Sequence, residues 1–321
     1  MTVTGRWFQS SAVKLVSRTK GPGRLAILIF HRVLPTPDPM RPGEPTVAEF
    51  ADQMELIRNH FYPLSLSDAL DRLAADSLPA RAVCVTFDDG YADNEKLALP
   101  ILKHYGISAC VFVATQFLNG GVMWNDRVIE GVRNYSGAEI ELGHYGLSSY
   151  SVRSAEERLV AAQSILVSIK HRDPTEREKI ALHISSLAEQ GAPDLMMTTP
   201  QLKNLLQAGV EIGAHTHSHP ILSSLDLQSS RGEIVRGKAE LEKIMGKPVR
   251  FFAYPNGRPQ IDYSEDHVEI VKALGFEAAL STHWGSADKN TDRFQLPRFT
   301  PWDRSPLRYA MRLAHNYRNV R

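Results

Sequence analysis

The sequence predicts an α/β fold, a distorted (β/α) barrel of about seven parallel strands with a helical insertion. Three observations point to it. Short apolar runs alternate with amphipathic stretches along most of the chain, as in parallel strands joined by helices. The 321 residues exceed the roughly 250 that a full barrel needs. The alternation breaks between residues 115 and 198 and then resumes, which indicates an insertion.

Continuous runs of apolar residues predict strands that are buried on both faces. The clearest are residues 25–30, which end at His31, and residues 82–87, which end at Asp88. Together the predicted strands span residues 25–30, 82–87, 107–114, 210–214, 249–254, 277–281 and 294–299.

Apolar residues spaced three and four apart predict helices between these strands. Phe50, Met54 and Ile57, for example, lie near one stripe of the first helix. Within the insertion, Asp173 precedes a capping pattern that starts a helix. Apart from the helix after Asp173, the predicted helices span residues 47–59, 66–74, 93–104, 154–170, 199–208, 228–245 and 264–273.

These elements divide the chain into three parts. Residues 1–24 form a basic, amphipathic segment, residues 25–303 form the barrel with an insertion at about 115–198, and residues 304–321 form a helix. The insertion is either a lid that recognises substrate or a cap that only shields the barrel, and the sequence leaves both open. The two terminal segments either lie on an anionic membrane, or pack on the barrel or are partly disordered.

Composition limits the class of protein. Apolar residues make up 43% and charged residues 23%, as in soluble globular proteins. The net charge of +1 argues against a nucleic-acid partner. Cys84 and Cys110 lie in strand-like runs, so we expect buried free thiols. Without a visible secretory signal or membrane span, we expect a cytoplasmic protein that contacts the inner membrane face at most.

Two polar clusters follow predicted strands, at the strand ends where such barrels build active sites. The first contains Asp88 and Asp89, and the second contains His215 and His219. If the second cluster is helical, the four-residue spacing places both rings on one face. Two imidazoles and the Asp89 carboxylate complete a zinc site with an open position, and Asp88 stays free for proton transfer. The alternative is that the aspartates cap a helix and the histidines lie on the surface.

The two clusters read Thr86-Phe87-Asp88-Asp89-Gly90 and His215-Thr216-x-x-His219. In this order they resemble the motifs of the polysaccharide deacetylases, the NodB-homology or carbohydrate esterase family four. The resemblance covers about residues 25–300, with the insertion outside the common pattern. It implies that Asp88 is the general base and that Asp89, His215 and His219 bind a divalent metal. Zinc suits these ligands, and Fe²⁺, Co²⁺ and Ni²⁺ are alternatives.

The third family motif, Arg-x-Pro-x-Gly, is altered to Ala253-Tyr254-Pro255-Asn256-Gly257. The resemblance implies that the Tyr254 N–H stabilises the oxyanion. Arg298 either approaches Asp88 in place of the missing arginine or is an ordinary surface residue. The family's general-acid histidine is not recognisable, and the candidates to replace it are, in order, His31, His283 and His217.

Aromatic side chains suit the apolar face of a sugar ring, and Tyr91, Phe117, Trp124 and Trp284 are candidates, although Phe117 better fits a core position. We also expect Pro255 to contact the substrate. The sequence thus predicts a metal-dependent hydrolase that removes an N-acetyl group from an amino sugar of a polysaccharide or a glycan precursor. A location at the membrane would suit a lipid-linked sugar substrate. The alternatives are a deformylase or another amide hydrolase, and a catalytically silent glycan-binding domain.

Overall fold

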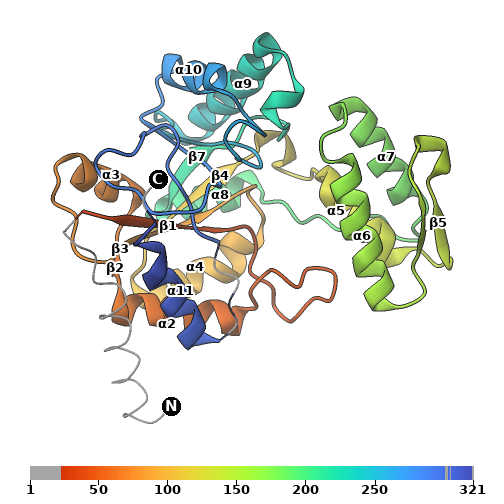
Figure 1. Cartoon of the computed structure of the whole chain (residues 1–321), viewed down its shortest axis with the longest axis horizontal. Helices are drawn as coiled ribbons and strands as arrows, with labels where there is room; N and C mark the ends of the chain where they lie inside the picture. The colour runs from red at the N-terminus through yellow and green to blue at the C-terminus, as the bar shows by residue number, and fades with distance from the viewer. Residues whose placement is uncertain (1–22, 301–302, 304, 320–321) are drawn as a thin grey trace.

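The computed structural model describes residues 23–300, 303 and 305–319, and its centre is a curled parallel sheet (Figure 1). The strand order is β1-β3-β4-β7-β8-β9, and the short β2 also pairs with β3. The bounds are β1 Leu25–Phe30, β2 Tyr62–Pro63, β3 Ala82–Phe87, β4 Ala109–Val113, β7 Glu211–Ala214, β8 Phe251–Ala253 and β9 Ala278–Leu280. The predicted fold class is therefore confirmed.

Helices cover the outside of this sheet, and side chains that cap their first turns explain where several of them begin. The Thr46 and Thr198 hydroxyls each accept a hydrogen bond from the backbone N–H three residues ahead, in a complete capping box. The bounds are α2 Val47–His60, α3 Leu66–Ala74, α4 Leu99–Tyr105 after a π-helical turn at Asn94–Ala98, α8 Thr199–Gln207, α9 Leu227–Met245 and α10 Glu265–Ala273. Each matches a helix predicted from the sequence.

The strand predicted at residues 294–299 is wrong. This segment makes only single bridges, from Leu296 to Leu280 of β9 and from Phe299 to Leu28 of β1. Pro297 between them has no N–H to donate, so a continuous ladder cannot form there. The Phe299 N–H nevertheless donates a hydrogen bond to the Ile27 carbonyl oxygen at 2.7 Å. The segment therefore connects the two edge strands and draws the sheet into a distorted barrel.

The core lies on both faces of the sheet. Every residue of β1 and β3 is buried, as expected for strands covered on both sides. Cys84 and Cys110 are buried free thiols, as predicted. The strands therefore form a rigid support whose carboxyl ends hold the polar residues described below.

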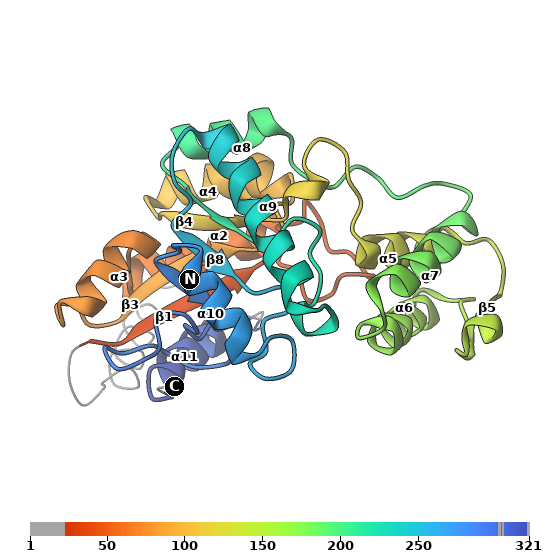
Figure 2. The same cartoon turned by 90° about the horizontal axis from the view of Figure 1, so that it is seen from above.

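The insertion forms a separate lobe beside the barrel (Figures 1 and 2). It has its own apolar core, to which Val128, Ile165 and Ile180 contribute. Its α5 and the β5–β6 hairpin were not predicted from the sequence. The elements are α5 Trp124–Asn134, β5 Glu139–Glu141, β6 Ser149–Ser151, α6 Ala155–Ile169 and α7 Pro174–Ser186.

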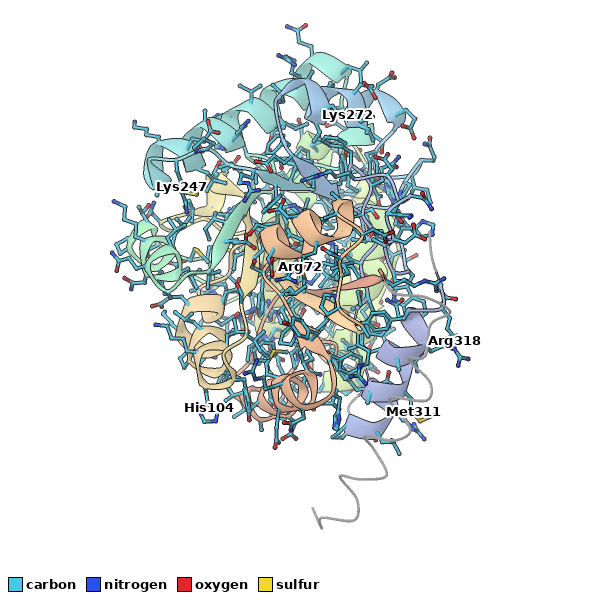
Figure 3. The ribbon with its side chains drawn as sticks, turned by 90° about the vertical axis from the view of Figure 1, so that its left-hand side faces the viewer. Arg72, His104, Lys247, Lys272, Met311 and Arg318 are labelled. Atoms are coloured by element: carbon cyan, nitrogen blue, oxygen red, sulfur yellow. The ribbon has the colours of Figure 1, made fainter. Side chains whose placement is uncertain are left out.

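The predicted N-terminal segment lies almost wholly outside the described residues, which begin at residue 23. The C-terminal helix α11 spans Pro306–Asn316 and buries Tyr309 and Leu313. Met311 lies on its outer side (Figure 3). The apolar side of α11 therefore packs on the barrel. Among the helices of the described residues, none has the length and apolar character to cross a membrane.

Candidate active site

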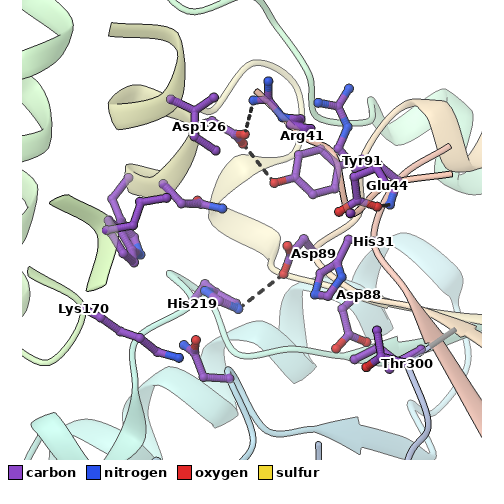
Figure 4. Close-up of a pocket in the computed structure, with 18 of the residues that line it drawn as sticks. His31, Arg41, Glu44, Asp88, Asp89, Tyr91, Asp126, Lys170, His219 and Thr300 are labelled. Carbon is purple, nitrogen blue, oxygen red and sulfur yellow. Dashed lines mark hydrogen bonds and ion pairs between the residues drawn. The ribbon is translucent and has the colours of Figure 1, made fainter. Parts of the chain in front are cut away.

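Three side chains from two strand ends converge on one point, and Figure 4 labels two of them, Asp89 and His219. Asp89 follows β3, and His215 and His219 follow β7. The two histidine Nε2 atoms are 3.2 Å apart, and the Asp89 Oδ1 atom lies 3.3 Å from that of His219 and 3.5 Å from that of His215. The structure therefore brings together the three residues predicted as metal ligands.

The spacing of these three atoms fits a tetrahedral cation. Zinc bonds of about 2.0–2.2 Å at tetrahedral angles separate neighbouring ligand atoms by about 3.3–3.5 Å. The Oδ1 atom of Asp89 is fully buried and has no hydrogen-bond partner among the described residues. A buried carboxylate oxygen without a partner is costly, and a cation at the centre of the triangle would satisfy it.

The protonation states also suit metal binding. The Nδ1 atom of His215 lies 2.7 Å from the Ala253 carbonyl oxygen, so it carries the proton and leaves Nε2 as a lone pair facing Asp89. Burial lowers the pKa of His219 to about 3, so this ring is neutral at neutral pH. Both rings are therefore free to donate a nitrogen lone pair.

The segment from His215 to His219 is a loop, so the condition under which a helix would align its two rings is not met. Thr216 and His219 have left-handed backbone angles, with φ of +64° and +55°. Asp89 and Asn256 share this conformation, with φ of +73° and +59°. Such angles are unfavourable for residues other than glycine and gather at functional sites. The backbone therefore turns sharply to aim these residues inward.

Helix α9 packs against the loop at residues 215–219, called the histidine loop below. The Glu233 carboxylate accepts hydrogen bonds from the N–H groups of His217 and Ser218, at 3.2 and 2.7 Å. Gly237, one turn further along, lies directly against the Thr216 carbonyl. A Cβ atom at Gly237 would come within 2.4 Å of that oxygen, so only glycine permits this contact.

We expect Gly237→Ala to destabilise the protein by about 1–3 kcal/mol, because the added methyl group forces the histidine loop away from α9. Gly232→Ala is the matched control on the same helix, since its Cβ would meet nothing within 4 Å. That variant should gain about 0.5–1 kcal/mol from helix propensity. Urea denaturation measures both, and equal effects of the two substitutions would contradict the contact.

Asp88 lies beside the triangle but is held by an arginine. Arg298 donates two hydrogen bonds to its two carboxylate oxygens, each 2.7 Å long. Arg298 is 1% exposed, so the alternative of an ordinary surface arginine is wrong. Burial by itself would raise the pKa of Asp88, but the Arg298 guanidinium outweighs it and holds that pKa below its usual value. Asp88 is therefore ionised and held in one orientation by Arg298.

Asp88, Asp89, His215 and His219 line one side of a cavity of about 530 Å³. Its opposite wall comes from α5 and α6 of the insertion, and Lys170 follows α6 at the cavity edge (Figure 4). The insertion therefore faces the candidate active site instead of only shielding the barrel. The residues that it contributes are Trp124, Asn125, Asp126, Ile129, Gln163, Leu166, Val167 and Lys170.

A buried charge cluster fixes the insertion to the barrel side of the cavity. Arg41, in the loop after β1, contacts the carboxylates of Asp126 at 2.8 Å and Glu130 at 2.5 Å. The Tyr91 hydroxyl donates to Asp126 at 3.0 Å. The sequence analysis missed Arg41 and Asp126, because a lone arginine in a loop and an aspartate in an unpredicted helix gave no pattern.

The other predicted residues are divided between the cavity and the body of the barrel. Tyr91 and His31 line the cavity. Burial would lower the pKa of His31, but the nearby carboxylates, Asp89 foremost, outweigh it and raise that pKa. Phe117 is buried, as its core interpretation predicted. His217 bonds to Thr115 and Glu240 and does not line the cavity.

The third-motif residues differ from expectation. The Tyr254 N–H donates to the Leu280 carbonyl at 3.1 Å within the sheet, so this N–H is not free for an oxyanion. Neither Tyr254 nor Pro255 lines the cavity, whereas the next residue, Asn256, does. His283 and Trp284 also lie outside the lining, and Trp284 stacks on Phe299.

The comparisons with known proteins concern the same region. The model of the family described as polysaccharide deacetylase matches residues 75–175 and 179–279, more than half of the chain. The chain is 22% identical over 283 residues to YxkH of Bacillus subtilis (strain 168), covering 88% of this chain and 72% of that protein. The name of YxkH assigns it provisionally to the polysaccharide deacetylases.

Two solved structures have a similar fold. The deacetylase PplD of Streptococcus pyogenes, solved with acetate, has a TM-score of 0.59 at 19% identity, over 90% of this chain and 99% of that one. IcaB from Ammonifex degensii has a TM-score of 0.59 at 21% identity, over 92% of this chain and 98% of that one. At such identities these similarities concern the fold alone.

Proposed function

The chain belongs to the polysaccharide deacetylase family, a family of hydrolases, and on this premise we propose that it removes the acetyl group from an N-acetylated amino sugar of a glycan. The observation that carries the proposal is the triangle of Asp89, His215 and His219, with the ionised Asp88 beside it. A pure binding module has no need for a second, arginine-held carboxylate next to a metal site.

In this proposal Asp89, His215 and His219 hold a divalent cation, for which zinc suits the two nitrogens and one oxygen. When bound, such a cation lowers the pKa of a water molecule and polarises the acyl carbonyl. Asp88 would accept the proton of the water molecule that attacks the carbonyl carbon. Arg298 keeps both Asp88 oxygens in place and leaves the carboxylate ionised before the attack.

Two further residues complete the proposed reaction. The C–N bond breaks only when the amine nitrogen gains a proton, and His31 lines the same cavity and can supply one. The developing oxyanion needs donors in addition to the cation. Asn256 lines the cavity and is therefore a better candidate than Tyr254, whose N–H belongs to the sheet.

The cavity suits a sugar. Its volume of about 530 Å³ lies in the range of small-molecule sites, and the rings of Tyr91 and Trp124 contribute apolar surface. Since it is bounded by the insertion, we propose that α5 and α6 take part in substrate recognition. We also propose that the glycan is lipid-linked and that the N-terminal segment, which lies outside the described residues, contacts a membrane surface.

The test is acetate release from an oligosaccharide of N-acetylglucosamine by the zinc-loaded protein, before and after treatment with a chelator. We expect release that stops on chelation and returns with zinc. Formate released only from an N-formyl sugar would instead support a deformylase. Glycan binding without release of any acid would support a silent binding domain.

A further inference from the structure

A second cavity, of about 660 Å³, adjoins the first at Trp124, whose ring lines both. It lies between the start of α7, the segment after β4 and the end of the histidine loop. Its polar lining includes three basic residues, and Glu178 is the only acidic residue among the described residues that form it. The lining residues are Gln116, Phe117, Gly121, Val122, Trp124, Arg127, Pro174, Thr175, Arg177, Glu178, Lys179, Leu182, Ser218 and Pro220.

Arg177 is the most unusual of these residues, because its charge is buried without a carboxylate partner among the described residues. It is 4% exposed, and its guanidinium lies 4.8 Å above the centre of the Trp124 ring. Its one hydrogen bond runs from Nη1 to the Lys170 carbonyl at 3.3 Å, and its buried Nε has none. Within the described part of the chain, no carboxylate lies within ion-pair distance of Arg177.

Two other buried arginines show what this position lacks. Arg41 contacts Asp126 and Glu130, and Arg298 contacts both oxygens of Asp88. Opposite charges therefore compensate the burial of both side chains. For Arg177, burial lowers the pKa, and Glu178 and Asp173 only partly oppose this. A guanidinium has five N–H donors, and leaving a buried cation uncompensated costs several kcal/mol.

The surrounding charge favours an anion as the missing partner. Arg127 and Lys179 add positive charge to the cavity, and the Glu178 carboxylate is already 3.0 Å from the Arg127 Nε. The planar fork of an arginine matches the oxygens of a carboxylate or a phosphate. We therefore propose that the second cavity binds an oxyanion, a carboxylate or a phosphate, with Arg177 as its central contact.

The site adjoins the proposed metal centre. Ser218 and Pro220, on either side of His219, line the second cavity, and Trp124 joins it to the first. An acidic group on a sugar next to the N-acetylated one is the source that this arrangement favours. That identification rests on the proposed function, whereas anion binding itself does not. A free inorganic anion has the same chemistry, and the experiment separates the two sources.

The first arm of the test is binding of inorganic phosphate, followed by calorimetry and by the fluorescence of Trp124 and the other tryptophans. We expect Arg177→Met to weaken binding at least tenfold, and Arg177→Lys, which keeps the charge but not the fork, to weaken it less. Arg153→Met is the matched control, since it removes an exposed cation of the insertion outside the cavity. Thermal unfolding checks that Arg177→Met folds, because replacing an unpaired buried charge should not lower stability.

The second arm compares acetate release from a neutral oligosaccharide of N-acetylglucosamine with release from one that alternates with glucuronic acid. We expect the wild type to have the lower KM for the acidic glycan, and Arg177→Met to lose this preference. Weaker phosphate binding without a glycan preference would support the site and identify a free anion as its source. Unchanged phosphate affinity and unchanged preference in Arg177→Met would overturn the proposal. A wild type that binds phosphate but releases no acetate would instead refute the proposed function alone.

Discussion

Asp88→Asn is expected to lower kcat for acetate release by about 10²–10⁴-fold, because the amide has the shape of the carboxylate but cannot take a proton from water. Asp88 lies beside the ligand triangle, 3.8 Å from His215 Nε2, and is not one of the three proposed ligands. Since Asp89 and both histidines stay in place, metal content should not change. The measurement is kcat at saturating glycan together with the zinc content of the same sample.

Asp262→Asn is the control for this effect. Asp262 is also fully buried and paired with an arginine, Arg258, but it does not line the cavity. We expect its kcat to stay close to that of the wild type. An Asp88→Asn variant that keeps its zinc and turns over as fast as Asp262→Asn would exclude Asp88 as the base.

Arg298→Met is expected to destabilise the protein by about 3–5 kcal/mol, since it leaves the Asp88 carboxylate buried without its partner. The guanidinium also donates to the Ser281 carbonyl at 2.8 Å, so a second acceptor loses its donor. The free energy of unfolding from urea titration measures this loss. Adding Asp88→Asn to the variant should restore part of the stability, because the uncompensated charge is then removed.

An exposed pair provides the comparison. Arg250 and Glu277 contact each other at 2.7 Å with about two fifths of each side chain exposed. Arg250→Met should cost about 1 kcal/mol or less, because water screens such a pair. If Arg298→Met lost as little free energy of unfolding as Arg250→Met, the buried Asp88–Arg298 pair would not hold the site in place.

The sequence predicted the parts of the fold that local patterns control. The apolar runs of β1 and β3 and the cap at Asp173 that starts α7 are such patterns, and the structure has them at nearly the expected bounds. Residues 294–299 were apolar enough for a strand, but Pro297 breaks the ladder. The α5 helix was missed, although Asp126 in its first turn and its apolar stripe fit a helix.

The candidate site was predictable where its residues stand in short motifs and not where they come together only in three dimensions. Asp89, His215 and His219 fall into this first group. Arg298 was predicted only as one of two alternatives, since its partner Asp88 lies 210 residues away in the sequence. Asn256 and Arg177 were missed for the same reason, because cavity lining and the absence of a partner are properties of the folded chain alone.

Titration with Co²⁺, which absorbs visible light when protein ligands bind it, tests the central claim most directly. The structure predicts one tightly bound cation per chain, and a loss of affinity greater than about 100-fold in each of Asp89→Ala, His215→Ala and His219→Ala, since even changes beyond the ligands cost 10–100-fold. His104→Ala is the control, an exposed histidine on the outside of the barrel (Figure 3). Three ligand variants that bind Co²⁺ as tightly as His104→Ala would show that these side chains do not hold the cation.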